Sequence, residues 1–564
     1  MDSRRPFLIL ADFNAGNFAA YLASDARQPL LDVWVGPMGR GIGLLVQQDE
    51  AASVDSHHDV IVWTHPHRVS DAFASLLASD NADPAATLAQ VDEFAEGIIA
   101  LARTARTVLV PTWVMPHGHR AFGMLAMRER IGPVNTLMRM NLRLSERLAD
   151  CPHVYILDSQ RWMQVAGKDA YNARLWHMGK IPFGNAVFKE AVAEVKAALR
   201  GITGETRKLI IVDLDNTLWA GVLGDEGWQR LRLGGHDPVG EAHAEFQRGL
   251  KALTRRGIIL GIVSKNDEAP ALEAIAKHPE MILSSTDFTG WRINWEDKAI
   301  NVAALTAELN LGLQSVVFID DNPVERDRVR EALPEVLVPD WPTSVLLFPS
   351  ALASLDCFDT AAVTAEDRSR QSAYRVEIAR ARERDALGSL DDWLRGLQLK
   401  VQVTDLTDGN GPRVSQLLNK TNQMNLSTRR LTGSELRAWA SAPPHKLWAF
   451  RVVDKFEDAG LTGILSLALH GDEARIVDFV LSCRVIGRQV EEAMLYQAVQ
   501  YASERGMKML SAEYLPTAKN GPCLRFLERS GLENRNGHVF RWDLSRPYAP
   551  PRHVELEILA EHPA

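Results

Sequence analysis

A group of acidic, hydroxyl and amino side chains in the middle of the sequence has the composition of a phosphate-handling site. Its members follow short apolar runs or open a helical pattern, and they are Asp213, Asp215, Thr217, Ser264, Lys298, Asp320 and Asp321. A short apolar run that ends in polar residues is typical of a buried parallel strand, and open parallel sheets bind ligands at the carboxyl ends of their strands. We therefore expect these residues at one edge of one sheet.

These residue types fit phosphoryl transfer. Clustered carboxylates repel one another unless a cation compensates them, and hard oxygen ligands of this kind suit Mg²⁺. One aspartate can attack phosphorus to form an aspartyl-phosphate, and a second carboxyl group can protonate the leaving oxygen and later activate water. A hydroxyl and an ammonium can bind the phosphoryl oxygens where the transition state is most anionic.

This constellation resembles the haloacid-dehalogenase (HAD) superfamily of phosphatases. The resemblance implies Asp213 as nucleophile and Asp215 as acid/base. It implies Thr217, Ser264 and Lys298 as phosphate binders, and Asp213, Asp215, Asp320 and Asp321 as the Mg²⁺ site. The segment between Thr217 and Ser264 is too short for a large cap and predicts a hairpin (221–233) and a helix (239–256). A small cap favours a substrate on a bulky carrier or one covered by a neighbouring domain.

The elements that position these residues alternate between strands and helices, which predicts an α/β multidomain protein. The predicted strands are 7–11, 60–63, 108–110 and 154–157 in the first region, and 209–212, 258–263, 281–284 and 315–319 in the second. The predicted divisions are 1–200, 201–350, a charged helical connector at 351–398, and a strand-rich region at 399–564.

Composition narrows the class of protein. The chain has 564 residues, of which 46% are hydrophobic and 24% charged, as in globular proteins. Its formal net charge of −9 argues against general nucleic-acid binding. Four cysteines with no CxxC pair are typical of a reducing compartment, and no apolar run is long enough to span a membrane. We expect a cytoplasmic protein that binds neither nucleic acid nor membrane.

The last region contains the turn LSCRVIGRQVEE (481–492), between a predicted strand and a predicted helix. It resembles the acyl-CoA-binding turn of the GNAT acetyltransferase fold, whose backbone N–H groups cradle a pyrophosphate, and Arg484, Gly487 and Arg488 match that pattern. A helix N-terminus and Arg484 would both lower the pKa of the Cys483 thiol and favour its reactive thiolate. The alternative is a buried cysteine that only fills a strand end.

Four separated blocks together resemble the FkbH-like HAD proteins of polyketide biosynthesis. They are DLDNTLWAGVLGDEG, FIDDNPVERDRVRE, NKTNQMNLSTRR and LSCRVIGRQVEE. The resemblance implies that a glyceryl unit from 1,3-bisphosphoglycerate is loaded onto an acyl carrier protein through a Cys483 thioester, with removal of the phosphate. The residues expected to bind the acyl group or the carrier are Asn422, Asn425, Thr428, Arg429, Arg430, Arg484, Gly487 and Arg488. The alternative for the first five is a polar loop packed against its own domain.

The front region resembles an SGNH-hydrolase-like fold, through FLILADFNAGNF near its start and RLWHMGKIPF near its end. The turn after the first strand is Asp12-Phe-Asn14, with no serine nucleophile, so His177 has no partner to activate. We expect a non-catalytic docking or covering module. Two other functions stay open, a phosphatase for a free phosphorylated metabolite and a non-enzymatic scaffold for carrier proteins.

Overall fold

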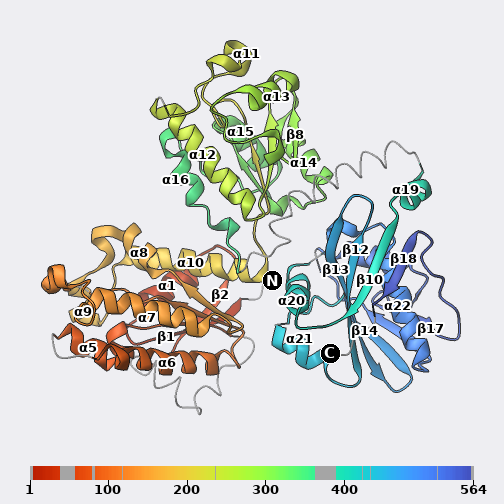
Figure 1. The fold of residues 1–564 in the computed structure, drawn as a ribbon, viewed down its shortest axis with the longest axis horizontal. Coiled ribbons are helices and arrows are strands. Elements are labelled where there is room, and N and C mark those ends of the chain that lie inside the picture. The colour runs from red at the N-terminus through yellow and green to blue at the C-terminus, as the bar shows by residue number, and fades with distance from the viewer. Residues whose placement is uncertain are drawn as a thin grey trace. The chain divides into compact units, whose positions relative to one another are not determined.

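The structure is a computed structural model that describes residues 4–37, 58–78, 83–116, 119–235, 237–361, 389–421, 423–431, 433–517 and 519–559 (Figure 1). The chain divides into two compact units, Met1–Ile202 and Thr203–Ala564, and the second unit contains two sheets. In the described part of the chain, no helix combines the length and the apolar character that a membrane span requires.

The first unit is built on a parallel sheet with the order β2-β1-β3-β4-β5. Four of these strands were predicted: β1 (Arg5–Ala11), β3 (Asp59–Trp63), β4 (Thr107–Pro111) and β5 (Val154–Leu157). The sequence did not reveal the edge strand β2 (Leu31–Val35), because polar Asp32 interrupts its apolar pattern and Trp34 is half-exposed.

Both faces of this sheet are covered by helices (Figure 1). Alternate residues of β3 point to opposite faces, so Ile61 and Trp63 join one apolar cluster and Val60 and Val62 join the other. The helices that supply the first cluster are α1 (Gly16–Ser24), α8 (Ser159–Ala166) and α10 (Asn185–Thr203). Those that supply the second are α5 (Asp71–Leu77), α6 (Pro84–Leu101) and α7 (Pro133–Leu148).

The second sheet is parallel, with the order β8-β7-β6-β9. Its strands are β6 (Leu209–Val212), β7 (Ile259–Ser264), β8 (Gly290–Ile293) and β9 (Val316–Ile319). The helices of this part are α12 (Pro238–Arg255), α13 (Glu268–Lys277), α14 (Lys298–Glu308), α15 (Pro323–Ala332) and α16 (Phe348–Ala353). The predicted strand at 281–284 is wrong. The backbone N–H groups of Ile282 and Leu283 donate to Oε1 of Gln247 at 3.0 and 3.1 Å, so they pair with a side chain rather than a strand.

Two other segments of this part differ from expectation. The predicted hairpin at 221–233 is instead two helical turns, α11 (Leu223–Glu226) and η3 (Trp228–Arg230), closed by one antiparallel bridge between Ala220 and Arg232. In the predicted connector, Leu352 and Phe358 are buried in the core of this sheet. The same connector contains α19 (Leu390–Gly396), and its residues 362–388 lie outside the described part.

The third sheet is mixed, with the order β16-β17-β15-β14-β13-β12-β10-β18. Its central strands are β10 (Leu399–Asp405), β12 (His445–Val453), β13 (Asp458–His470), β14 (Glu473–Leu481), β15 (Met509–Glu513) and β17 (Val539–Asp543), with β16 (Glu533–Asn534) and β18 (Val554–Ile558) at the two edges. Helices α20 (Gly411–Lys420) and α21 (Gly433–Ala440) supply one apolar cluster, and α22 (Val490–Glu504) and α23 (Gly521–Arg529) supply another.

The strands β14 and β15 run parallel but pair over only part of their length. Pairing joins Glu473–Ile476 to Met509–Ala512 and then stops, so the two strands form a fork. The short strand β11 (Met424–Asn425) enters this fork and pairs with the end of β14. On the other side of the inserted segment, the N–H of Leu515 donates to the carbonyl of Leu426 at 3.1 Å. The chain therefore fills this fork with its own backbone.

Candidate functional site

The acidic residues meet where β6 and β9 end side by side. The N–H of Asp213 continues the ladder and donates to the carbonyl of Ile319 at 3.0 Å, which places Asp213 beside Asp320. One carboxylate oxygen from each of Asp213, Asp320 and Asp321 lies within 4.8 Å of the others, and among the described residues this is the only such acidic cluster. The sequence-based expectation of one shared sheet edge holds for these three residues.

A buried ammonium group lies inside the cluster. Lys298 opens α14, and its Nζ lies 3.0 Å from Oδ1 of Asp213 and 2.6 Å from Oδ2 of Asp320. Burial raises the pKa of Asp320 to about 7, with repulsion from Asp213 adding to the effect and Lys298 opposing it. Burial and the same repulsion also raise the pKa of Asp321. One ammonium therefore does not compensate three carboxylates.

The cluster fits a divalent cation such as Mg²⁺. Oδ1 of Asp213 is buried and accepts no hydrogen bond of good geometry, although Lys298 is close to it. A buried carboxylate oxygen without a donor, in a cluster with uncompensated negative charge, is the type of acceptor that a hard cation satisfies. Asp213, Asp320 and Asp321 would hold the ion.

Asp215 lies apart from this trio, although it was predicted as a fourth metal ligand. Its Oδ1 accepts from Nε1 of Trp219 at 3.0 Å and from the N–H of Leu223 at 3.2 Å, and its Oδ2 accepts from Nδ2 of Asn266 at 2.9 Å. Burial raises the pKa of Asp215, while these donors oppose the increase. A carboxyl group held by three donors next to Asp213 is suited to proton transfer rather than to metal binding.

The other predicted phosphate binders have different surroundings. Oγ1 of Thr217 donates to Oδ1 of Asp321 at 3.3 Å and accepts from its N–H at 3.1 Å, so this hydroxyl positions Asp321. Ser264 is buried at the end of β7, the neighbour of β6. Asn216 has a φ of 54° in the turn between Asp215 and Thr217, a left-handed conformation that asparagine tolerates better than most residues.

Several supporting residues were not predicted from the sequence. Arg326 is buried and donates to the carbonyls of Asp320 and Asp321, both at 2.7 Å. Nδ1 of the buried His243 lies 3.0 Å from the carbonyl of Thr217, and burial lowers the pKa of His243 to about 4. Asn266 could have been found from the sequence only through its position two residues after Ser264. Trp219, His243 and Arg326 carried no such signal, since each lies in a pattern that is typical of an ordinary core or surface residue.

The turn before α22 is closed by the chain's own carboxylate. The N–H of Gly487, one of the groups expected to face a phosphate, donates to Oε1 of the buried Glu491 at 2.7 Å. Arg488 is also buried, lies 3.4 Å from Asp454 and donates to the carbonyl of Arg484. These contacts give Gly487 and Arg488 partners within the protein.

The backbone of Cys483 opens η8 (Cys483–Val485), and its side chain lies outside the described part of the structure. Of the other cysteines, Cys523 is buried, and burial raises the pKa of its thiol to about 12. Burial also raises the pKa of Cys151, and Cys357 is buried. Elevated pKa values make the thiols of Cys151 and Cys523 poor nucleophiles at neutral pH.

The predicted acyl- or carrier-binding segment includes the end of β11 and the loop after it, and Asn422 lies outside the described residues. Asn425 is buried and its Oδ1 accepts from the N–H of Thr428 at 2.8 Å, which holds Thr428 at a φ of 53°. Arg429 pairs with the fully buried Asp478. Arg430 donates to the carbonyl of Leu418, and burial lowers its pKa. Most of the loop's polar groups therefore hold the loop in place.

The front unit contains a pair that the sequence did not reveal. Asp12 follows β1, and His65 follows β3. The strand order reverses between these two strands, because β2 is added on one side of β1 and the later strands are added on the other. Nδ1 of His65 lies 2.8 Å from Oδ1 of Asp12, and its backbone N–H donates to Oδ2 at 2.8 Å. The predicted His177 is instead exposed on α9 (Ala173–Gly179).

No protein-family model matches this chain, and no curated protein matches its sequence. The structure resembles that of the N-terminal part of BF1531 from Bacteroides fragilis, which contains a phosphatase domain and was crystallised with Mg. That similarity has a TM-score of 0.58 and 24% identity, and covers 64% of this chain and 95% of that chain. It shows the fold of the matched region.

Two acetyltransferase structures match a smaller part of the chain. One is the ribosomal-protein-S18-alanine N-acetyltransferase of Escherichia coli, with a TM-score of 0.21, 11% identity, and coverage of 26% of this chain and 94% of that chain. The other is the PaiA N-acetyltransferase of Thermoplasma acidophilum, with a TM-score of 0.20, 10% identity, and coverage of 25% and 98%.

The predicted fold class is confirmed. The chain is a multidomain α/β protein with a parallel sheet in the front unit, a second parallel sheet that carries the short α11–η3 cover, and a third, mixed sheet. The region matched by the BF1531 structure shares the fold of that phosphatase-containing part.

Proposed function

We propose that this protein is a Mg²⁺-dependent enzyme that transfers a glyceryl unit from 1,3-bisphosphoglycerate to an acyl carrier protein and removes its phosphate. The observation that supports it most is the cluster of Asp213, Asp320 and Asp321, in which the first two are buried, the third is half-buried, and Lys298 pairs with the first two. Non-catalytic scaffolding does not account for this cluster, because three carboxylates with a single positive charge beside them destabilise a fold unless a ligand compensates them.

Phosphate removal uses the residues at the edge of β6 and β9. A carboxylate oxygen of Asp213 attacks phosphorus, the bond to the glyceryl oxygen breaks, and the protonated Asp215 gives its proton to that oxygen. Asp215 then takes a proton from water, which attacks the aspartyl-phosphate and releases inorganic phosphate. A bound Mg²⁺ would add positive charge next to the phosphoryl group. Lys298 and Ser264 supply the protein's own positive charge and hydroxyl group at this edge.

The acyl group follows a different path. The thiolate of Cys483 attacks the acyl phosphate, the carbon–oxygen bond to phosphate breaks, and a thioester forms without ATP. The carrier's thiolate then attacks this thioester and releases the Cys483 thiolate. The small α11–η3 cover favours a substrate attached to a carrier over a free metabolite, which phosphatases generally enclose to exclude water.

Intact-mass analysis of an acyl carrier protein tests the proposal. The carrier is incubated with the full chain, Mg²⁺ and 1,3-bisphosphoglycerate, and a glyceryl adduct on its pantetheine arm is expected. A carrier that stays unloaded while free phosphate is released from small phosphate esters would instead support a phosphatase for a free metabolite.

A cysteine variant tests the path of the acyl group. Cys483→Ala should abolish carrier loading and the enzyme-bound adduct, while hydrolysis of a small phosphate ester continues. Cys523→Ala is the matched control and should load normally, because the Cys523 thiol is buried with a raised pKa. Loading by Cys483→Ala would mean that the carrier's own thiol attacks the donor directly.

A further inference from the structure

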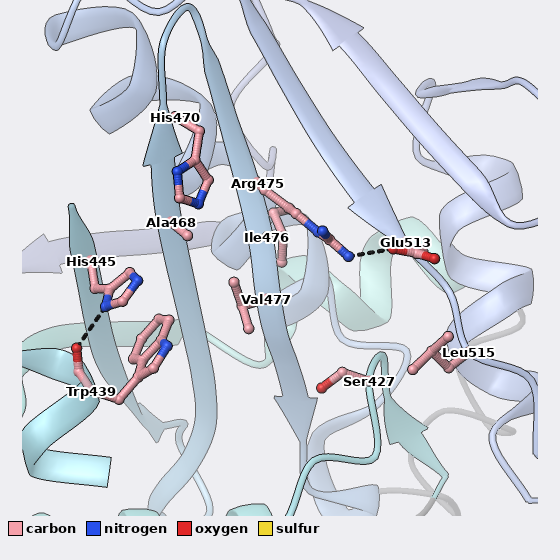
Figure 2. A pocket seen from close by; sticks show the side chains of 10 residues that line it. All are labelled: Ser427, Trp439, His445, Ala468, His470, Arg475, Ile476, Val477, Glu513 and Leu515. Carbon is pink, nitrogen blue, oxygen red and sulfur yellow. Dashed lines mark hydrogen bonds and ion pairs between the residues drawn. The ribbon is translucent and has the colours of Figure 1, made fainter. Parts of the chain in front are cut away.

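A pocket of about 330 Å³ lies beside the fork of β14 and β15 and is lined from α21, β12, β13, β14 and β15 (Figure 2). Its apolar lining includes Ala468, Val477 and Leu515, and its polar lining includes His470, Arg475 and Glu513. The polar side chains of Ser427 and His445 point into it from opposite sides (Figure 2). A concave site in which apolar side chains and convergent polar groups meet can bind a small molecule.

The contacts of His445 fix which of its ring nitrogens carries the proton. Nδ1 lies 2.8 Å from the carbonyl oxygen of Trp439, and a carbonyl can only accept, so Nδ1 is the donor. The ring stacks on Trp439 with a centroid distance of 4.1 Å and an angle of 9°, which holds its orientation. In the neutral imidazole, Nε2 therefore carries the lone pair, and Figure 2 shows this nitrogen on the pocket side. His445 presents a hydrogen-bond acceptor to the pocket.

Ser427 presents the same kind of group. Its hydroxyl donates to Oδ1 of the fully buried Asp478 at 3.2 Å, because a carboxylate that is also paired with Arg429 can only accept. The hydroxyl proton is thus used, and the lone pairs of Oγ remain for a ligand. Trp439 also lines the pocket, and its indole N–H can only donate. A matching ligand must therefore supply donors to Ser427 and His445 and can offer an acceptor to Trp439, and hydroxyl groups do both.

The charges around the pocket are already paired. Arg475 forms an ion pair with Glu513 at the rim, and Arg429 forms one with Asp478 behind Ser427. A phosphate dianion offers no donor to Ser427 or His445, and both arginines described at the pocket already have carboxylate partners, so the desolvation of the dianion would be poorly repaid. A neutral group with hydroxyl donors meets both acceptors.

We propose that this pocket binds a short, neutral, hydroxyl-bearing acyl group, and that it takes the glyceryl group only after its phosphate has been removed. The identity of the acyl group as glyceryl rests on the proposed function. The chemistry of the ligand rests on the pocket itself. Because β11 fills the fork, a ligand cannot enter between β14 and β15. It would reach Ser427 and His445 from the face of the sheet that α20 and α21 cover.

Calorimetric titration of the full chain with three synthetic pantetheine thioesters tests this inference. Glyceryl-pantetheine carries two hydroxyl donors, propionyl-pantetheine carries none in its acyl group, and 3-phosphoglyceryl-pantetheine adds the dianion. The glyceryl thioester should bind about 10-fold more tightly than the propionyl thioester, since each added hydrogen bond contributes roughly 3- to 10-fold. The phosphorylated thioester should bind more weakly than the glyceryl thioester. Equal binding of all three, or preference for the phosphorylated one, would overturn the inference.

Two substitutions locate the binding. Ser427→Ala and His445→Phe should each weaken glyceryl-pantetheine about 3- to 10-fold and leave propionyl-pantetheine unchanged, because each removes one acceptor. Phenylalanine keeps an aromatic ring stacked on Trp439, so a weaker affinity of this variant would not result from a disordered pocket wall. Ser503→Ala and His538→Phe are matched controls at exposed positions and should bind like the unchanged chain. An unchanged affinity in both pocket variants would rule out this site.

The outcome is separable from that of the proposed function. Selective binding of glyceryl-pantetheine with no carrier loading from 1,3-bisphosphoglycerate would keep the pocket and reject the donor. Carrier loading with no selective binding would keep the function and reject the pocket.

Discussion

Carboxylates gather at two turns of the molecule, and their partners differ. At the edge of β6 and β9, three of them lie together, two of these pair with one buried ammonium, and Oδ1 of Asp213 has no hydrogen-bond donor of good geometry. At the start of α22, Glu491 accepts the N–H of Gly487, and the mostly exposed Arg529 lies 3.4 Å from its Oε1.

The difference separates a site that needs a ligand from one whose backbone donor is already taken by the chain's own carboxyl group. Helix N-termini attract negative charge, and α22 meets this with Glu491 and Glu492 in its first turn. An external phosphate at that turn would compete with a buried carboxylate. The edge of β6 and β9 lacks one cation instead, so the structure favours phosphate chemistry there and argues against a pyrophosphate cradle before α22.

The strongest test of this contrast is Asp213→Asn. The amide keeps the volume but removes the nucleophilic charge, so release of phosphate should fall by at least ~10³-fold. The carrier should then accumulate in the phosphoglyceryl form, detected by intact mass, and removal of Mg²⁺ by a chelator should act in the same direction. Glu491→Gln is the matched carboxylate control and should release phosphate normally. A wild-type rate in Asp213→Asn would show that another group is the nucleophile.

Removing the buried ammonium should have the next largest effect. Lys298→Met leaves Asp213 and Asp320 buried without their cation, and the loss of one partner from a buried pair costs about 3–5 kcal/mol. Denaturant unfolding measures the change, and saturating Mg²⁺ should restore part of the stability because the ion binds only the folded cluster. Lys277→Met, at an exposed ion pair, is the control with little expected effect. Full stability of Lys298→Met without Mg²⁺ would contradict the role given to Lys298.

The sequence predicted those features of this site that depend on neighbouring residues in the chain, and it missed those that depend on contacts between distant segments. The strands β6 and β9 were predicted almost to the residue, because each is a run of four buried apolar residues followed directly by aspartate. The strand at 281–284 was wrong because Gln247, on a distant helix, takes its N–H groups. Local pattern cannot show a side chain that replaces a neighbouring strand.

The same limit applies to the side chains around the site. Lys298 was predicted because it opens a helix, but its contact with both Asp213 and Asp320 depends on how α14 packs. The Asp12–His65 pair joins two strand ends that are far apart in sequence, and no local pattern links the two residues. Asp215 was placed in the metal cluster by the resemblance to HAD phosphatases, whereas the turn at Asn216 directs it to Trp219 and Asn266.

The pH dependence of stability tests the closed turn before α22. Burial, with repulsion from Glu492, raises the pKa of Glu491 to about 7, above its ordinary value of 4.5. A raised carboxyl pKa means that the folded state holds the proton more tightly, so this contribution to stability is complete below pH 4.5 and is lost as the pH rises through about 7.

Glu491→Gln should remove that loss. The amide oxygen can still accept from Gly487, and the group carries no charge, so the variant should gain stability over the unchanged chain as the pH rises from 4.5 to 7 and keep a constant advantage above it. Thermal unfolding at several pH values measures the difference, and Glu533→Gln, at an exposed site, is the control. A variant that is less stable at pH 8 would mean that the ionised Glu491 is well compensated by Arg529.

The smallest expected effect concerns the donors that hold Asp215. Trp219→Phe fills nearly the same buried space but removes the Nε1–H that lies 3.0 Å from Oδ1 of Asp215, leaving the donors from Leu223 and Asn266 in place. Loss of one of three hydrogen bonds to a carboxylate should reduce phosphate release about 3- to 10-fold and lower the free energy of unfolding by about 1 kcal/mol. Trp295→Phe is the control, because the Trp295 side chain is largely exposed and donates to Asp267, away from the trio.

If Asp215 transfers the proton, the loss should be greatest for esters with poor leaving groups, which depend most on protonation, and small for a nitrophenyl phosphate. An equal loss for both kinds of ester would assign Trp219 to packing and leave the acid/base role of Asp215 without this support.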